Sequence, residues 1–106
     1  VVAEGWGVRC PPCVASLPHL AKLAKDNEKN GLVVVGMELQ NSPKQAILDT
    51  IKKGGVEYPI MAGGSLPGMT GSIPHICVFD KKGKLTYVGR PSDPAFEAAV
   101  TAALQK

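Results

Sequence analysis

The sequence is poor in aromatic residues, in cysteine and in blocks of like charge. Phe, Trp and Tyr make up 5% of the 106 residues, and the formal charge of +3 comes from lysines spread along the chain. Proteins that bind nucleic acid or membrane surfaces usually carry clustered basic residues with aromatic side chains among them. Neither kind of partner is therefore indicated, and no apolar run is long enough to span a membrane.

The chain does contain enough apolar residues for a folded domain. Hydrophobic residues account for 44% and charged residues for 20%, values that are ordinary for a globular protein and too apolar for a disordered one. We expect a single, monomeric domain over residues 1–106. Because the chain opens on Val1 without an initiator methionine, we also expect a longer precursor or an excised domain, from which an anchor segment is missing.

Only three cysteines are present, and two of them stand in a Cys-Pro-Pro-Cys motif at positions 10–13. An odd number fits one reactive pair plus one extra thiol better than a disulfide framework. The same spacing is half of a zinc site, but a structural zinc normally takes four ligands, and beyond the pair only Cys77, His19 and His75 remain. A metal or iron–sulfur binding module that uses the pair, Cys77 and His75 stays open as the non-enzymatic alternative.

The motif follows a short apolar strand and precedes a helical pattern, so we expect it at the first turn of a helix. Proline is tolerated there, and Pro11 and Pro12 stiffen the turn without interrupting the helix. The positive end of the helix and the adjacent Arg9 favour the thiolate of Cys10, the predicted nucleophile. Cys13, more enclosed, is the predicted resolving cysteine. The motif therefore predicts a redox-active disulfide that works without a bound cofactor.

The first half of the chain alternates strand and helix. Val1–Ala3 is apolar and β-prone, and apolar residues at helical spacing then extend from the motif to Asn30-Gly31, which suits a left-handed cap. Pro18 lies inside this helix and is expected to kink it. The β-branched run at 32–37 is typical of a strand buried on both faces of a parallel sheet.

The second half predicts a further helix, a hairpin and a last helix. Ser42 to Gln45 form a capping-box pattern that starts a helix ending at Gly54-Gly55. After it we expect a short extended piece at 58–61, a mobile glycine-rich loop at 63–71, hairpin strands at 76–79 and 85–88, and a helix that Asp93 caps and Pro94 begins. The order β-α-β-α-β-β-α predicts an α/β fold with a mixed central sheet and helices on both faces.

This order, with a dithiol between the first strand and the first helix, resembles the thioredoxin fold over nearly the whole chain. Trp6 stands four residues before the motif, Pro18 five residues after it, and Pro74 just before the third strand, each where thioredoxins place the same residue. The motif and the Val-Glu-Tyr-Pro-Ile segment are most similar to the TlpA/ResA-like branch. The resemblance implies a thiol-disulfide oxidoreductase that acts on protein disulfides and is recharged by an upstream redox partner, in an extracytoplasmic location, with the cytoplasm as the alternative.

The resemblance also implies roles for individual residues. Pro74 would be cis, and the backbone of Ile73 would pair with an incoming substrate peptide, with Trp6 as a further substrate-binding residue. Glu4 lies where thioredoxins carry a buried carboxylate that takes the proton of the resolving cysteine. A carboxyl in an apolar strand is desolvated, which raises its pKa toward neutrality. The alternative is an exposed Glu4 near a frayed terminus.

Two positions depart from the thioredoxin pattern. Arg9 replaces the usual aromatic residue before the first cysteine, and His75 replaces the small polar residue after the cis-proline. Both carry or can carry positive charge near Cys10, which would stabilise its thiolate and make the pair more oxidising. A partly buried, hydrogen-bonding His75 is the alternative. Cys77, on the same strand, is expected to be an inert core residue.

A second enzymatic interpretation is a peroxide-reducing relative of the same fold. Such an enzyme needs a peroxidatic cysteine in a Thr-x-x-Cys setting, and none of the three cysteines has a threonine at that position. We therefore expect disulfide exchange rather than peroxide reduction.

Overall fold

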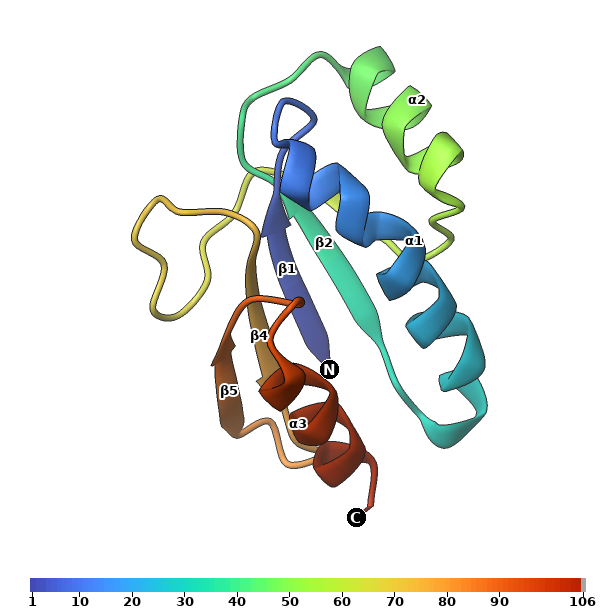
Figure 1. Cartoon of the computed structure of the whole chain (residues 1–106), viewed down its shortest axis with the longest axis vertical. Helices are drawn as coiled ribbons and strands as arrows, with labels where there is room; N and C mark the ends of the chain where they lie inside the picture. Colours follow the sequence, from blue (N-terminus) through green and yellow to red (C-terminus); the bar gives the residue numbers. More distant parts are fainter. Residues whose placement is uncertain (106) are drawn as a thin grey trace.

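Strands and α-helices alternate along the first half of the chain in this computed structural model, which describes residues 1–105 (Figure 1). The elements are β1 (Val2–Trp6), α1 (Pro11–Asp26), the 3₁₀ turn η1 (Glu28–Asn30), β2 (Val34–Glu38), α2 (Lys44–Gly54), β3 (Ile60–Ala62), β4 (His75–Phe79), β5 (Leu85–Gly89) and α3 (Pro94–Leu104). The strands form one sheet in the order β3-β2-β1-β4-β5. β1, β2 and β3 are parallel, and β4 and β5 are antiparallel to their neighbours, which confirms the predicted mixed sheet.

β1 is the central strand, and all of its residues are buried. The register places Glu4 between Gly36 of β2 and Ile76 of β4. Successive side chains of a strand point to opposite faces, so Glu4 and Trp6 face one side of the sheet and Ala3 faces the other. This alternation decides which side chains lie beneath the cysteine motif.

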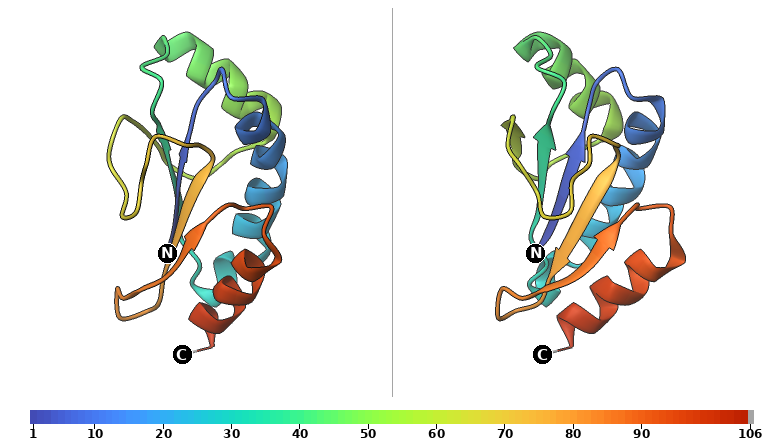
Figure 2. Two further views of the ribbon diagram at one scale, coloured as in Figure 1. Left: turned by 60° about the vertical axis from the view of Figure 1, so that its left-hand side comes forward. Right: turned by 90° about the vertical axis from the view of Figure 1, so that its left-hand side faces the viewer.

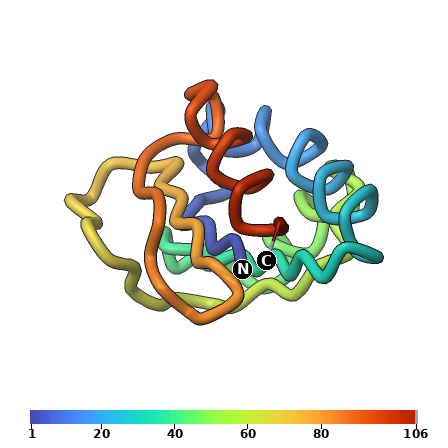
Figure 3. Tube along the Cα trace, turned by 90° about the horizontal axis from the view of Figure 1, so that it is seen from below, coloured from blue at the N-terminus to red at the C-terminus, as the bar shows by residue number. Residues whose placement is uncertain are grey.

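The α-helices all lie on the face of the sheet that carries Trp6 (left view of Figure 2). Helices α1 and α3 lie on the same side of the strands (Figure 3). They bury Leu20 and Phe96 in one cluster with the strands. Helix α2 buries Ile47 in a cluster with Trp6 and Leu17. The prediction of helices on both faces is therefore wrong. The chain moves from β1 to β2 to β3 in one direction, and two right-handed crossovers made in one direction place their helices on the same face.

The opposite face is covered by the segment between β3 and β4, shown in yellow in Figure 2. Its Leu66 is only 7% exposed and packs in a cluster with Ala3 and Cys77. This segment is the glycine-rich stretch that the sequence predicts as a loop. Each glycine in a helix costs about 1 kcal/mol relative to alanine, so a stretch so rich in glycine covers the sheet as a loop instead of as a helix.

The ends of α1 and α3 follow local signals. The α-helical part of α1 contains Pro18 and ends at Asp26, earlier than predicted, and a 3₁₀ turn continues to Gly31. Gly31 closes this turn with a φ of +89°, a left-handed conformation that glycine adopts without a steric penalty. Asp93 caps α3 as predicted, because its carboxylate accepts the N–H of Ala95 at 2.9 Å.

The capping box predicted for α2 does not form. The helix begins at Lys44, and the preceding Pro43 makes no side-chain capping bond. The hydroxyl of Ser42 donates instead to Glu38 at 2.7 Å, and Gln45 donates to Asp49 at 2.9 Å. In a capping box the serine oxygen accepts an N–H of the helix, whereas here the Ser42 hydroxyl donates to a charged carboxylate, which makes a stronger hydrogen bond.

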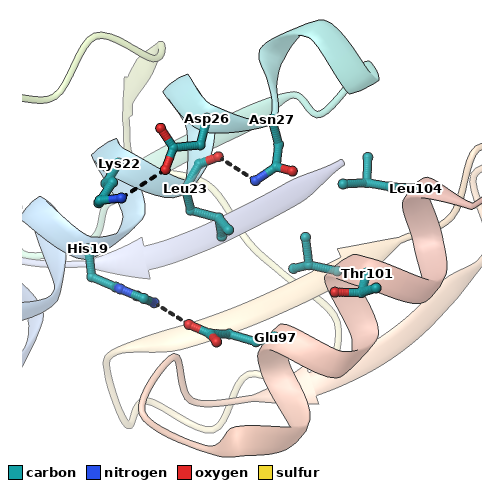
Figure 4. Close-up of a pocket in the computed structure, with 9 residues that line it drawn as sticks. His19, Lys22, Leu23, Asp26, Asn27, Glu97, Thr101 and Leu104 are labelled. Atoms are coloured by element: carbon teal, nitrogen blue, oxygen red, sulfur yellow. Dashed lines mark hydrogen bonds and ion pairs between the residues drawn. The ribbon is translucent and has the colours of Figure 1, made fainter.

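A groove between α1 and α3 is lined by two ion pairs (Figure 4). His19 Nε2 lies 2.8 Å from a carboxylate oxygen of Glu97, and Lys22 Nζ lies 3.0 Å from Asp26. Exposed ion pairs of this kind contribute about 1 kcal/mol at most to folding stability. Across the described residues, no helix is both long and apolar enough to cross a bilayer.

Candidate active site

Cys10 and Cys13 form a disulfide at the amino end of α1, with their Cα atoms 5.2 Å apart. Cys10 is the N-cap residue, and its Sγ accepts a hydrogen bond from the backbone N–H of Cys13 at 3.3 Å. The first N–H groups of a helix have no partner within the helix and carry partial positive charge. Once the disulfide is reduced, this position stabilises the thiolate form of Cys10.

The two sulfurs differ in their access to solvent. Cys10 is 7% exposed, whereas Cys13 is completely buried and packs in a cluster with Trp6 and Leu17. The Pro11-Pro12 pair between the cysteines is exposed. A group that approaches from outside therefore reaches Cys10 before Cys13.

The segment that enters β4 lies against the same sulfur. The Ile73–Pro74 peptide bond is cis, and the carbonyl oxygen of Ile73 lies 3.7 Å from Cys10 Sγ. Pro74 is buried and Ile73 is half-buried. Backbone polar groups of this segment are thus next to the more exposed sulfur of the pair.

Glu4 is completely buried on the face of the sheet that α1 covers. Its Oε2 accepts a hydrogen bond of 3.2 Å from the hydroxyl of Ser16, which also lies 2.7 Å from the carbonyl oxygen of Cys13. Burial raises the pKa of Glu4 to about 8, although the Ser16 hydrogen bond acts in the opposite direction. The alternative of an exposed Glu4 is therefore wrong, and one hydroxyl group connects its carboxyl to the backbone of Cys13.

Trp6 does not have the surface that a substrate-binding residue needs. Its side chain is completely buried in the cluster that contains Cys13 and Ile47. Gly36 makes room for it, since a Cβ at that position would lie 3.0 Å from Trp6 Nε1 and 2.7 Å from Ile60 Cδ1. The structure thus corrects the predicted role: Trp6 supports the motif from beneath.

Arg9 is exposed and is held by Gln40, in the connection between β2 and α2. The backbone N–H of Arg9 donates to Gln40 Oε1 at 2.7 Å, and its guanidinium donates to the carbonyl oxygen of the same residue at 3.2 Å. The charge of Arg9 therefore lies beside the motif but is anchored on the side of β2.

Glu38 organises this side of the site, and the sequence reasoning missed it. Its carboxylate is 1% exposed and accepts the N–H of Val8 at 3.0 Å, the N–H of Gln40 at 3.0 Å, and both the hydroxyl and the N–H of Ser42. Burial disfavours its charge, but these hydrogen bonds outweigh burial and lower the pKa of Glu38. The only signal in the sequence was an acidic residue at the end of a buried strand.

His75 and Cys77 lie on the opposite face of the sheet from the motif, because they pair with Gly5 and Ala3. His75 is buried and its Nε2 donates to the carbonyl oxygen of Pro67 at 2.8 Å, so the hydrogen-bonding alternative describes it. Cys77 is completely buried, 3.7 Å from the same Nε2, and burial raises the pKa of its thiol. A buried thiol with a raised pKa is a poor nucleophile, as predicted for Cys77.

The four residues of the metal-binding alternative do not meet. Cys10 and Cys13 face α1, whereas His75 and Cys77 face the segment between β3 and β4. Within residues 1–105, no three His, Cys, Asp or Glu side chains come together as metal ligands. The geometry therefore does not fit a site built from this set.

A disulfide that caps a helix, beside a cis-proline in a sheet of this order, is the arrangement of a thioredoxin-like fold. The chain belongs to the Redoxin family, which it matches over residues 1–104.

Individual relatives agree with this family. The chain is 29% identical over 56 residues to "Thiol-disulfide oxidoreductase ResA" of Halalkalibacterium halodurans, a match that covers 53% of this chain and 31% of that protein. The matched region thus spans about a third of the curated relative. Among solved structures, a thiol:disulfide interchange protein of Chlorobium tepidum TLS superimposes with a TM-score of 0.83 at 24% identity, covering 97% of this chain and 78% of that one. A thioredoxin-like protein of Neisseria meningitidis gives 0.82 at 19% identity, covering 99% and 74%. At these identities the structures show the fold.

Proposed function

We propose that this domain reduces disulfides in partner proteins through its Cys-Pro-Pro-Cys motif. The thiolate of Cys10 attacks one substrate sulfur, releases the other as a thiolate, and forms a mixed disulfide. Cys13 then attacks Cys10 Sγ, closes the Cys10–Cys13 disulfide and releases the second substrate thiol. Two electrons pass to the substrate, and an upstream dithiol protein restores the pair. The observation that carries this proposal is the position of Cys10, N-cap of α1 and 7% exposed above a completely buried Cys13.

We infer that the substrate binds as an extended peptide beside Ile73 and Pro74. The support is the carbonyl oxygen of Ile73, which lies 3.7 Å from Cys10 Sγ, so a strand that pairs with this backbone has its own disulfide near the nucleophile. Main-chain pairing requires little of the substrate side chains. This binding mode suits an enzyme that acts on several partner proteins.

Glu4 is proposed as the group that accepts the proton of Cys13 before resolution. A thiol must lose its proton to attack, and Cys13 is buried away from solvent bases. A carboxyl with a pKa of about 8 exchanges protons near neutral pH, where an ordinary carboxyl is always ionised.

The order of the two cysteines is tested by alkylation and by trapping. Near neutral pH, a limiting amount of iodoacetamide should label Cys10 of the reduced protein before Cys13. Cys13→Ser should accumulate mixed disulfides with insulin, and Cys10→Ser should form none. Faster labelling of Cys13 would contradict the assignment.

The reducing direction and an extracytoplasmic location are proposed from the TlpA/ResA-like resemblance and from the match to ResA. A redox titration of the pair tests the direction. A potential near the roughly −270 mV of thioredoxin supports a reductant, whereas a potential near about −120 mV would make the domain an oxidant.

A further inference from the structure

The carboxyl of Glu4 has one polar connection to the rest of the described chain. Its side chain is completely buried, its Oε1 has no hydrogen-bond partner within residues 1–105, and its Oε2 is bonded to the Ser16 hydroxyl at 3.2 Å. The other titratable group that senses its charge is Tyr58, whose pKa is raised by burial and by Glu4 and whose hydroxyl also lacks a partner in this range. Within the described residues, Ser16 is therefore the hydrogen-bonded group through which a proton can leave Glu4.

Ser16 reaches from this buried carboxyl to the surface. It lies one turn after Cys13 on α1, is partly exposed, and is one of the residues that line a groove with Pro12, Pro74 and Arg90. The groove adjoins the motif on the side of the cis-proline. Water in the groove thus comes within reach of the same hydroxyl that contacts Glu4.

The hydroxyl of Ser16 has one hydrogen and two acceptors. Its oxygen lies 2.7 Å from the carbonyl oxygen of Cys13 and 3.2 Å from Glu4 Oε2. When Glu4 is ionised, its charge attracts the hydroxyl hydrogen, because hydrogen bonds to charged acceptors are stronger than those to neutral ones. When Glu4 is protonated, its O–H can donate to Ser16 Oγ, and the hydrogen of Ser16 can then donate to the carbonyl oxygen of Cys13 or to water in the groove.

We propose that Ser16 relays the proton of Glu4 to solvent in the groove, which resets Glu4 after each turnover. Glu4 passes its proton to Ser16 Oγ as Ser16 gives its own hydrogen to a water or buffer base in the groove, so that Glu4 is left ionised and the solvent base gains one proton. The step involves no oxidation or reduction. The inference rests on the proposed role of Glu4, and it makes Ser16 a second residue of the proton path.

The test compares Ser16→Ala with Ser16→Thr, which keeps a hydroxyl at this position. The protonation of Glu4 is followed by carbon-13 NMR of its carboxyl across pH 6 to 10, in the oxidised protein and without substrate. We expect fast exchange between the protonated and ionised forms in wild type and Ser16→Thr, and exchange slower by about a hundredfold in Ser16→Ala. A role of Ser16 limited to hydrogen bonding would move the midpoint of this titration and leave the exchange rate unchanged.

Each outcome of this comparison decides the proposal. Exchange in Ser16→Ala as fast as in wild type would overturn the relay, and equal slowing in both variants would show that the hydroxyl is not the carrier. The role of Glu4 as a base is judged separately, by the resolution kinetics of Glu4→Gln. Normal resolution in that variant would remove the proposed base while leaving the exchange measurement, made without substrate, as it stands.

Discussion

Glu4→Gln is the sharpest test of the site because it keeps the volume of the side chain and removes its ability to take a proton. With a pKa of about 8, roughly one tenth of Glu4 is ionised at pH 7. A positioned general base typically accelerates a step by about 10² to 10⁴. If one tenth of the molecules carry the active base, the variant should resolve mixed disulfides about 10 to 1,000 times more slowly at pH 7.

The assay is a rapid-quench experiment with a peptide disulfide, run from pH 6 to pH 10. The rate of mixed-disulfide formation by Cys10 serves as an internal reference and should be the same in both proteins, since this step does not use Glu4. Resolution by Cys13 should be slow in Glu4→Gln at neutral pH and approach wild type as rising pH ionises the thiol directly. The mixed disulfide should therefore accumulate in Glu4→Gln at neutral pH, between its formation by Cys10 and its resolution by Cys13.

The matched control is Glu28→Gln, which removes the same charge from the exposed turn η1. It should show the wild-type rate at every pH. Equal resolution rates for wild type and Glu4→Gln across the whole range would refute the role of Glu4 as base, whatever its pKa.

Three further predictions concern buried groups. The pKa of Glu4 is raised from 4.5 to about 8, a shift that corresponds to about 5 kcal/mol of folding free energy. Wild type should therefore lose stability relative to Glu4→Gln as the pH rises from 4.5 to 8. Urea unfolding at several pH values would measure this loss. The pKa of Glu38 is lowered, so its contribution to folding stability is present above the ordinary carboxyl pKa and is lost as the pH falls through the lowered pKa. The free energy of unfolding of Glu38→Gln should therefore be about 1 to 3 kcal/mol lower than that of wild type at pH 7. A difference between the two proteins that stayed constant on acidification would contradict this. Cys77→Ala should retain wild-type insulin reduction, since Cys77 lies on the far face of the sheet, and a loss of activity in a folded variant would give it a role in the chemistry.

Much of the fold and the centre of the site can be predicted from the sequence because the signals are local. The spacing of Cys10 and Cys13, with prolines between them and a helical pattern after them, specifies a disulfide at a helix start within a few residues. The β-branched run before Met37 and the Asp93-Pro94 start of the last helix are equally short-range signals. The burial of Glu4 could be expected because it lies within an apolar strand.

The tertiary structure decided what depends on strand order and on contacts between distant residues. Helices on one face follow from the direction in which successive crossovers run, a property of the whole sheet that no single segment carries. Glu38 bonds to Val8, 30 residues away in the sequence, and Ser16 bonds to Glu4, 12 residues away. No local sequence pattern predicts either contact. Trp6 is buried because α2 packs over it, so its side chain supports the motif and is not exposed for the predicted contact with substrate. Local spacing determines the dithiol, and long-range packing determines which groups surround it.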